Sequence, residues 1–209
     1  KRYSQINTYD YRKKIKGKIN MSVELSKEIR SIVTSEGYIE ISIVKVEKPK
    51  PLENEVLMRV EASPINPSDL GLLISFAADF DSLKVSGSGD ETVVKIKIHP
   101  ALINAMKSRL GQSMAVGNEG GGIVEDAGCN GKNLIGKTIG AAGGAMYSQY
   151  RCVPISSCLV MDENTSPAEA ASSFVNPLTV LAFIETMRME NHTAIVNSAA
   201  ASNLGQMLI

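Results

Sequence analysis

Alternation of apolar and polar residues in short segments is the feature that most restricts the fold of this chain. Isoleucines occupy every second position from 39 to 43, within a segment that runs from Tyr38 to Pro51. Glu55–Ala62 and residues 94–98 repeat the pattern. Successive side chains of a strand point to opposite faces, so each segment is predicted to be a half-buried strand. The fold class is therefore expected to be mostly β with short helices, the β part forming a partly open barrel.

Helical signals are weaker in this first part of the chain. Pro100 suits the first turn of a helix, and four apolar residues follow it at helical spacing: Leu102, Ile103, Met106 and Leu110. Met21 opens a stretch of ordinary helix-forming residues. Six glycines make residues 127–150 loop-rich.

The pattern changes near residue 165. Ser166 and Glu169 flank Pro167 in the arrangement of a capping box, which predicts a helix start. Asn176-Pro177 offers a second cap and a second helix. Thr193–Asn197 is predicted to be a buried strand, followed by a run of small residues and the start of a helix. Strand, small-residue turn and helix is how a dinucleotide-binding unit begins.

The net charge of zero conceals a basic leader. Residues 1–20 hold seven Lys/Arg against one acid, which leaves 15 basic and 21 acidic residues in 21–209. Such a leader is either an arm for nucleic acid or a membrane surface, or a disordered or non-native segment. We favour the second interpretation, because no apolar face or aromatic stripe accompanies the charge.

Membrane and secreted classes are not supported. The sequence has no run of about 18 apolar residues, and no apolar segment follows the basic leader. Cys129, Cys152 and Cys158 form no CxxC pair, so we expect reduced cysteines in a cytoplasmic protein.

Five segments together resemble quinone oxidoreductases of the medium-chain dehydrogenase/reductase family. In chain order they are Glu55–Leu70 (EVLMRVEASPINPSDL), Gly117–Val124 (GNEGGGIV), Gly143–Pro154 (GGAMYSQYRCVP), Asn176–Glu185 (NPLTVLAFIE) and Ala199–Leu208 (AAASNLGQML). They are similar to the cleft strand and loop, the glycine-rich turn, the segment that closes the catalytic domain, the helix beside the nicotinamide and the phosphate turn. The resemblance runs over residues 36–209.

This resemblance implies a domain organisation. Residues 21–165 are expected to form a GroES-like catalytic domain, and residues 166–209 the truncated start of an NAD(P)-binding Rossmann domain, after the leader 1–20. The segment between Leu70 and Gly117 is longer than in minimal relatives, and it either reshapes the substrate mouth or forms a dimer surface.

No zinc is expected. The zinc-dependent branch has a Cys in the cleft loop and a His in the glycine-rich turn, where this chain has Asn66 with its neighbours and Asn118. Glu119 remains, but one carboxylate is not a zinc site. His99 and His192 lie outside the cleft motifs, so structural roles are expected for both.

The resemblance also implies the site. Asn66 is the candidate catalytic residue, facing the nicotinamide, or else a loop amide that bonds backbone before Pro67. Ser68 and Asp69 are expected to cap the following helix. Tyr147 and Tyr150 are not obvious replacements for the tyrosine that some relatives have after this Asn.

The cofactor-binding candidates are Asn66 together with residues of the later motifs. Asn176 and Thr179 resemble residues that border the cleft, although Asn176 is equally suited to a helix cap. The phosphate turn would present backbone amides to phosphates. Its candidates are Ser202, Asn203, Leu204 and Gly205.

The predicted function is reduction of quinones or other conjugated carbonyls by hydride from NADP(H), with NAD also possible and without zinc. We expect the activity to belong to a longer parent, a homodimer, and the 209-residue fragment alone to be inactive. The alternative is a non-catalytic binding or structural protein on the same scaffold. No nucleic-acid or membrane partner is expected.

Overall fold

The computed structural model describes residues 23–76 and 78–209, and the basic leader 1–20 lies outside them. Ten strands form two five-stranded sheets in this part of the chain. The first sheet has the order β4-β5-β2-β1-β6 and the second the order β10-β8-β7-β3-β9. All pairs of neighbouring strands within them are antiparallel.

The elements follow one another along the described chain. The strands are β1 (Leu25–Val33), β2 (Tyr38–Glu47), β3 (Glu55–Ala62), β4 (Ala78–Ser86), β5 (Val93–Ile98), β6 (Met114–Ala115), β7 (Glu119–Ala127), β8 (Thr138–Ala142), β9 (Tyr150–Pro154) and β10 (Cys158–Val160). The α-helices are α2 (Pro67–Leu73), α3 (Pro167–Ala170), α4 (Val175–Met189) and α5 (Asn203–Met207). Short 3₁₀ helices are η1 (Gly89–Glu91), η2 (Pro100–Arg109), η3 (Cys129–Leu134) and η4 (Ile155–Ser157).

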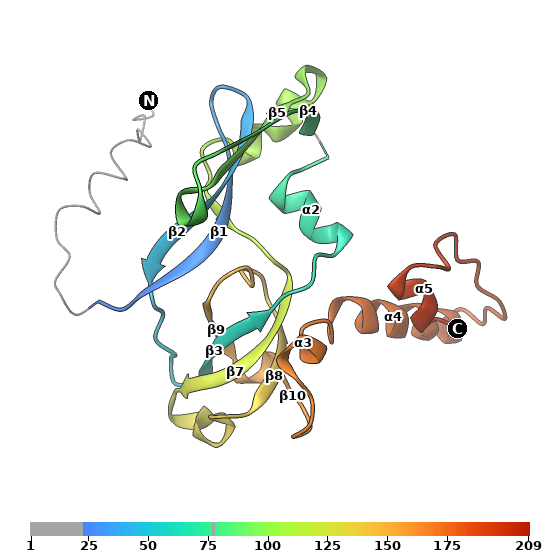
Figure 1. The fold of residues 1–209 in the computed structure, drawn as a ribbon. Helices are drawn as coiled ribbons and strands as arrows, with labels where there is room; N and C mark the ends of the chain where they lie inside the picture. Colours follow the sequence, from blue (N-terminus) through green and yellow to red (C-terminus); the bar gives the residue numbers. More distant parts are fainter. Residues whose placement is uncertain (1–22, 77) are drawn as a thin grey trace, which may run out of the picture.

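Residues 147–149 join the two sheets. Two backbone hydrogen bonds connect these residues to β1. Ile29 N donates to Tyr147 O at 2.8 Å, and Gln149 N donates to Lys27 O at 2.9 Å. Gln149 O also accepts from Val60 N in β3 at 2.9 Å. The sheets therefore curl into a half-barrel, with α3, α4 and α5 extending from one side of the second sheet (Figure 1).

Each sheet buries its own apolar cluster. Nine residues form the larger one: Val56, Met58, Val124, Ala127, Leu134, Ile139, Ala141, Met146 and Val153. The smaller one consists of Val33, Ile39, Ile98 and Met106. The strands predicted from alternation at 38–51, 55–62 and 94–98 form as β2, β3 and β5, and Ile39, Val56 and Met58 are fully buried.

Three segments differ from what their sequence suggests. The stretch after Met21 is a strand, β1, and not a helix, and residues 138–142 of the glycine-rich stretch form β8. The helix after Pro100 is the 3₁₀ helix η2, in which Met106 is buried and Leu102 and Ile103 are exposed, as is Leu110 just after it.

The expected buried strand at Thr193–Asn197 does not form either. These residues adopt no strand, and Val196 is 96% exposed. A parallel strand is stable only when neighbours cover it, and no described strand pairs with this segment.

None of the helices among the described residues is long and apolar enough to cross a bilayer.

Gly121 allows α3 to lie directly on β7. A Cβ there would lie 2.1 Å from Pro167 O and 2.6 Å from Ala171 N. We expect Gly121→Ala to lower the free energy of unfolding by about 1–3 kcal/mol, because the backbone of α3 must move. Urea denaturation measures the change.

Gly71→Ala is the matched control. A Cβ at Gly71 would meet only the Phe76 ring, at an ordinary contact distance of 3.6 Å. Gly71 lies in helix α2, where alanine is a better helix former than glycine. This variant should be neutral or slightly stabilised. Equal losses for Gly121→Ala and Gly71→Ala would contradict the close approach of α3.

Candidate functional site

A buried carboxylate, that of Glu119 at the start of β7, lies at the centre of the candidate site. Its side chain is 1% exposed. Glu119 Oε1 accepts a hydrogen bond from Asn66 Nδ2 at 2.8 Å, and Oε2 accepts from the backbone N of Phe174 and of Val175, both at 2.9 Å. One side chain thus connects β7, the loop before α2 and the first turn of α4.

Asn66 precedes α2 and is 6% exposed. Its backbone N donates to Asp69 Oδ2 at 2.8 Å, and Pro67 occupies the first helical position. The prediction that Asp69 caps this helix is confirmed. The Asn66 side chain bonds Glu119 through its Nδ2 and also takes part in a capping box with Asp69.

Asp69 also fixes the glycine-rich turn. Its Oδ1 accepts from Asn118 N at 2.8 Å, and its side chain is 1% exposed. Asn118 Nδ2 donates in turn to Ser68 Oγ at 3.0 Å. Ser68 therefore bonds Asn118 in this turn, although it was expected to cap α2.

Tyr147 bonds the loop that precedes α2. Its hydroxyl donates to Pro64 O at 3.0 Å, while Ser63 Oγ donates to Met146 O at 2.8 Å. Burial raises the pKa of Tyr147 to about 12, and the neighbouring charge of Asp69 adds to the shift. The hydroxyl is thus held in its neutral form.

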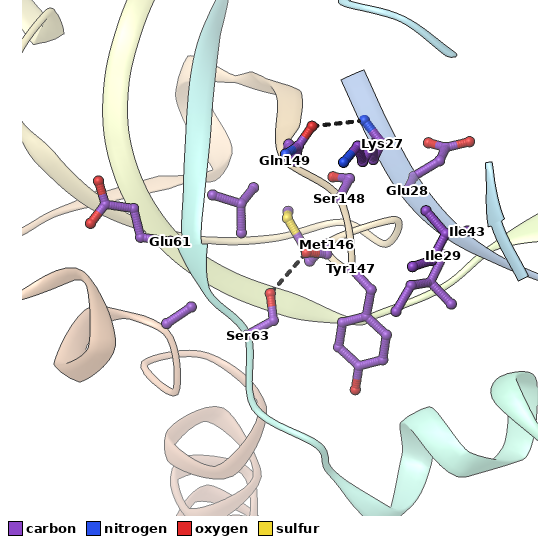
Figure 2. Close-up of a pocket in the computed structure, with 12 residues that line it drawn as sticks. Lys27, Glu28, Ile29, Ile43, Glu61, Ser63, Met146, Tyr147, Ser148 and Gln149 are labelled. Atoms are coloured by element: carbon purple, nitrogen blue, oxygen red, sulfur yellow. Dashed lines mark hydrogen bonds between the residues drawn. The ribbon is translucent and has the colours of Figure 1, made fainter. Parts of the chain in front are cut away.

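A hollow of about 310 Å³ opens beside Tyr147 (Figure 2). It lies between β1, β3 and residues 146–149, and Ile29, Ile43 and Met146 form part of its apolar wall. It contains none of the residues that the sequence proposed for the site.

The expected cap of α4 was wrong. The helix begins at Val175, so Asn176 lies within its first turn, and the residue before the helix, Phe174, makes no side-chain cap. Glu119 supplies the cap from β7. Thr179 Oγ1 donates to Val175 O at 2.6 Å, which leaves its lone pairs able to accept.

The predicted phosphate turn forms a helix start. Ser202 Oγ accepts from Gly205 N at 3.0 Å and donates to Ala199 O at 2.7 Å. A Cβ at Gly205 would lie 2.4 Å from Ala199 O, so only glycine fits there. The amides of Asn203 and Leu204 belong to the first turn of α5, where a helix has no partner of its own for N–H groups.

The structure brings these residues together to different degrees. Asn66 is joined through Glu119 to the start of α4, which carries Asn176 and, one turn on, Thr179. The turn Ser202–Gly205 is further removed. Its helix α5 packs against α4, and the hydroxyl of Ser202 bonds within its own segment, to Ala199 O and Gly205 N.

The cysteines and histidines that the sequence analysis considered can also be placed. No group of three or more His, Cys, Asp or Glu residues suited to a metal ion occurs within 23–76 and 78–209. The three cysteines are free, and burial raises the pKa of Cys152 and of Cys158 to about 11. His99 Nδ1 accepts from Ala101 N at the start of η2, a cap of the structural kind expected of it.

Known proteins that resemble this chain are found among solved structures. No protein-family model and no curated protein matches the chain. Among solved structures, a candidate NADPH:quinone reductase from Mesorhizobium loti is 21% identical with a TM-score of 0.60, covering 88% of this chain and 50% of that chain. The quinone oxidoreductase from Coxiella burnetii is 18% identical with a TM-score of 0.57, over 89% and 52%. A mycobacterial protein solved with NADPH is 16% identical with a TM-score of 0.55, over 88% and 47%.

The chain has the fold of these reductases. The resemblance predicted from the five motifs is thereby confirmed at the level of the fold. The chain spans about half the length of the structures it matches.

Sequence reasoning missed the connecting role of Glu119, which it considered only as a metal ligand. The available signal was an acidic residue next to Gly120–Gly122 at the start of an apolar strand. A carboxylate in such a place is buried and needs several donors.

The raised pKa of Tyr147 predicts a pH effect. Because its pKa is higher in the folded than in the unfolded protein, its stabilising contribution is complete below pH 10 and is lost as pH rises towards about 12. Difference absorbance of the phenolate should show one tyrosine titrating near pH 12 that is missing in Tyr147→Phe. Identical titration curves for the two proteins would refute this environment.

Proposed function

We propose that this chain is part of an NAD(P)H-dependent oxidoreductase that reduces quinones or other conjugated carbonyls by hydride transfer without zinc. One observation carries the proposal: a buried amide–carboxylate pair, Asn66 and Glu119, meets the start of α4 in a fold shared with quinone oxidoreductases and with an NADPH-bound protein. The catalytic part would be residues 21–165, and residues 166–209 would begin the nucleotide-binding part.

The residues present fit a nicotinamide dinucleotide in part. Gly205 and the small residues before it let the chain pass close to a pyrophosphate, and the first-turn amides of Asn203 and Leu204 are donors for it. Ser202 bonds Gly205 N itself, which removes that amide from the set. The turn therefore offers fewer donors than its four residues would suggest.

The cofactor would supply the hydride, and the protein would supply position and hydrogen bonds. Asn66 keeps one Nδ2 hydrogen beyond the bond to Glu119, so it can donate to a carbonyl oxygen that gains negative charge. The Thr179 hydroxyl can accept a hydrogen bond from a carboxamide or a ribose. Asn176 lies three residues before Thr179 in α4.

A second candidate is a non-catalytic protein on this scaffold. Its support is that polar groups of the proposed site already satisfy one another: Asn66 bonds Glu119, Thr179 bonds Val175 O and Ser202 bonds Gly205 N. Such a network stabilises a fold without any ligand.

The test uses the full-length product of the gene that encodes this chain. Calorimetric titration with NADPH and NADH measures cofactor binding, and nicotinamide absorbance in the presence of a simple quinone measures turnover. We expect binding of at least one cofactor and turnover that falls by about tenfold to a thousandfold in Asn66→Ala, because one donor to the developing charge is lost.

Ser68→Ala is the control, since Ser68 lies two residues after Asn66 in the first turn of α2, is exposed, and accepts a hydrogen bond from the side chain of Asn118. Its turnover should stay close to wild type. Absence of both binding heat and turnover in the wild-type protein would favour the non-catalytic candidate.

A further inference from the structure

Every partner of the Glu119 carboxylate is a hydrogen-bond donor. Oε1 faces Asn66 Nδ2, and Oε2 faces two backbone N–H groups, those of Phe174 and Val175. An ionised carboxylate only accepts, so this arrangement suits the anion. It also decides which end of the Asn66 amide points inward, because the carbonyl end would repel the carboxylate.

We propose that Glu119 is a positioning residue, which fixes the orientation of the Asn66 amide and, with its other oxygen, the first turn of α4. The purpose of that orientation, binding of a ligand by Asn66, rests on the proposed function. Asn66 is left with one further N–H, a donor on a rigidly held group, for a ligand that carries an acceptor.

The second oxygen ties the other half of the proposed site to the first. Val175 begins a helix of 15 residues, and a negative charge is stabilising at the N-terminus of a helix. Asn176 follows in the same turn, so a shift of Glu119 moves Asn66 and α4 relative to each other.

The competing explanation is that Glu119 only holds α4 to the barrel. Both explanations predict a loss of stability when Glu119 changes, because truncating a buried hydrogen-bonded charge is costly. The two explanations differ in whether the orientation of the Asn66 amide contributes to turnover. A variant that restores the hydrogen bonds but alters residue 66 separates them.

Glu119→Gln and the double variant Asn66→Asp/Glu119→Gln make this test. In the single variant the Gln carbonyl can accept from α4, but its NH₂ group then faces the NH₂ group of Asn66. In the double variant a carboxylate at position 66 accepts from that NH₂ group, and one negative charge is retained. Glu169→Gln is the matched control, because Glu169 is an exposed carboxylate that accepts from Ser166 N at another helix start.

Three measurements on the full-length protein are compared: Tm, the side-chain amide signals of Asn66 in ¹⁵N NMR, and quinone-dependent NADPH turnover. We expect Glu119→Gln to lower Tm by roughly 5–15 °C and the double variant to regain at least half of the loss. Turnover should fall by about tenfold or more in Glu119→Gln and stay low in the double variant despite its regained Tm. Glu169→Gln should keep wild-type turnover.

The NMR signature does not depend on turnover. In the wild type, one of the two Asn66 side-chain protons should be shifted downfield and exchange slowly, because it is bonded to a buried carboxylate. That feature should disappear in Glu119→Gln and persist in Glu169→Gln. Its absence from the wild type, or its persistence in Glu119→Gln, would overturn the positioning role whatever the activity.

Turnover that follows Tm across the variants, including recovery in the double variant, would also overturn it and leave Glu119 as a structural tie. If the wild type neither binds cofactor nor turns over quinone, the proposed function fails. The orientation of Asn66 by Glu119 is then still decided by the NMR signal and the Tm cycle, so the two failures are distinguishable.

Discussion

The charge of Glu119 must be compensated within the protein, because its side chain is buried and removed from water. Burial of an unpaired carboxylate would cost several kcal/mol, and three donors on its two oxygens offset this cost. The donors come from two segments that lie far apart in the sequence, so the carboxylate holds α4 and the loop before α2 at fixed distances from β7. The geometry of the candidate site depends on this one group.

Close packing of the backbone brings α4 within reach of that group. Gly121 in β7 and Gly140 in β8 leave no room for a Cβ beneath α3, where Pro167 O and Ala170 O lie 2.1 and 2.6 Å from the two ideal Cβ positions. With α3 seated on the glycines, the chain enters α4 next to the start of β7. Larger side chains would move α3 outward, and Glu119 would lose its bonds to the backbone of α4.

The predictable parts of the fold are those whose signal is local. β2, β3 and β5 follow from alternation, and the capping box of α3 forms as expected, with Glu169 N bonded to Ser166 Oγ. β1 escaped prediction because two of its three buried residues, Ser26 and Ser31, are polar. At the site, Asn66 could be proposed from its motif, but its partner lies 53 residues away in sequence and the α4 amides lie 55 and 56 residues from Glu119. No periodicity or local spacing reveals a contact of that kind.

The C-terminal segment shows the same division between local and distant determinants. Its helix start forms because Ser202 reaches donors and acceptors only three residues away, Gly205 N and Ala199 O, and these bonds need no other part of the chain. The segment expected to be a strand, 193–197, has three apolar residues suited to burial, Ala194, Ile195 and Val196. A strand there requires hydrogen bonds from neighbouring strands, and none of the described strands provides them. The sequence of a turn can therefore specify its own shape, whereas the sequence of a parallel strand specifies only which neighbours it needs.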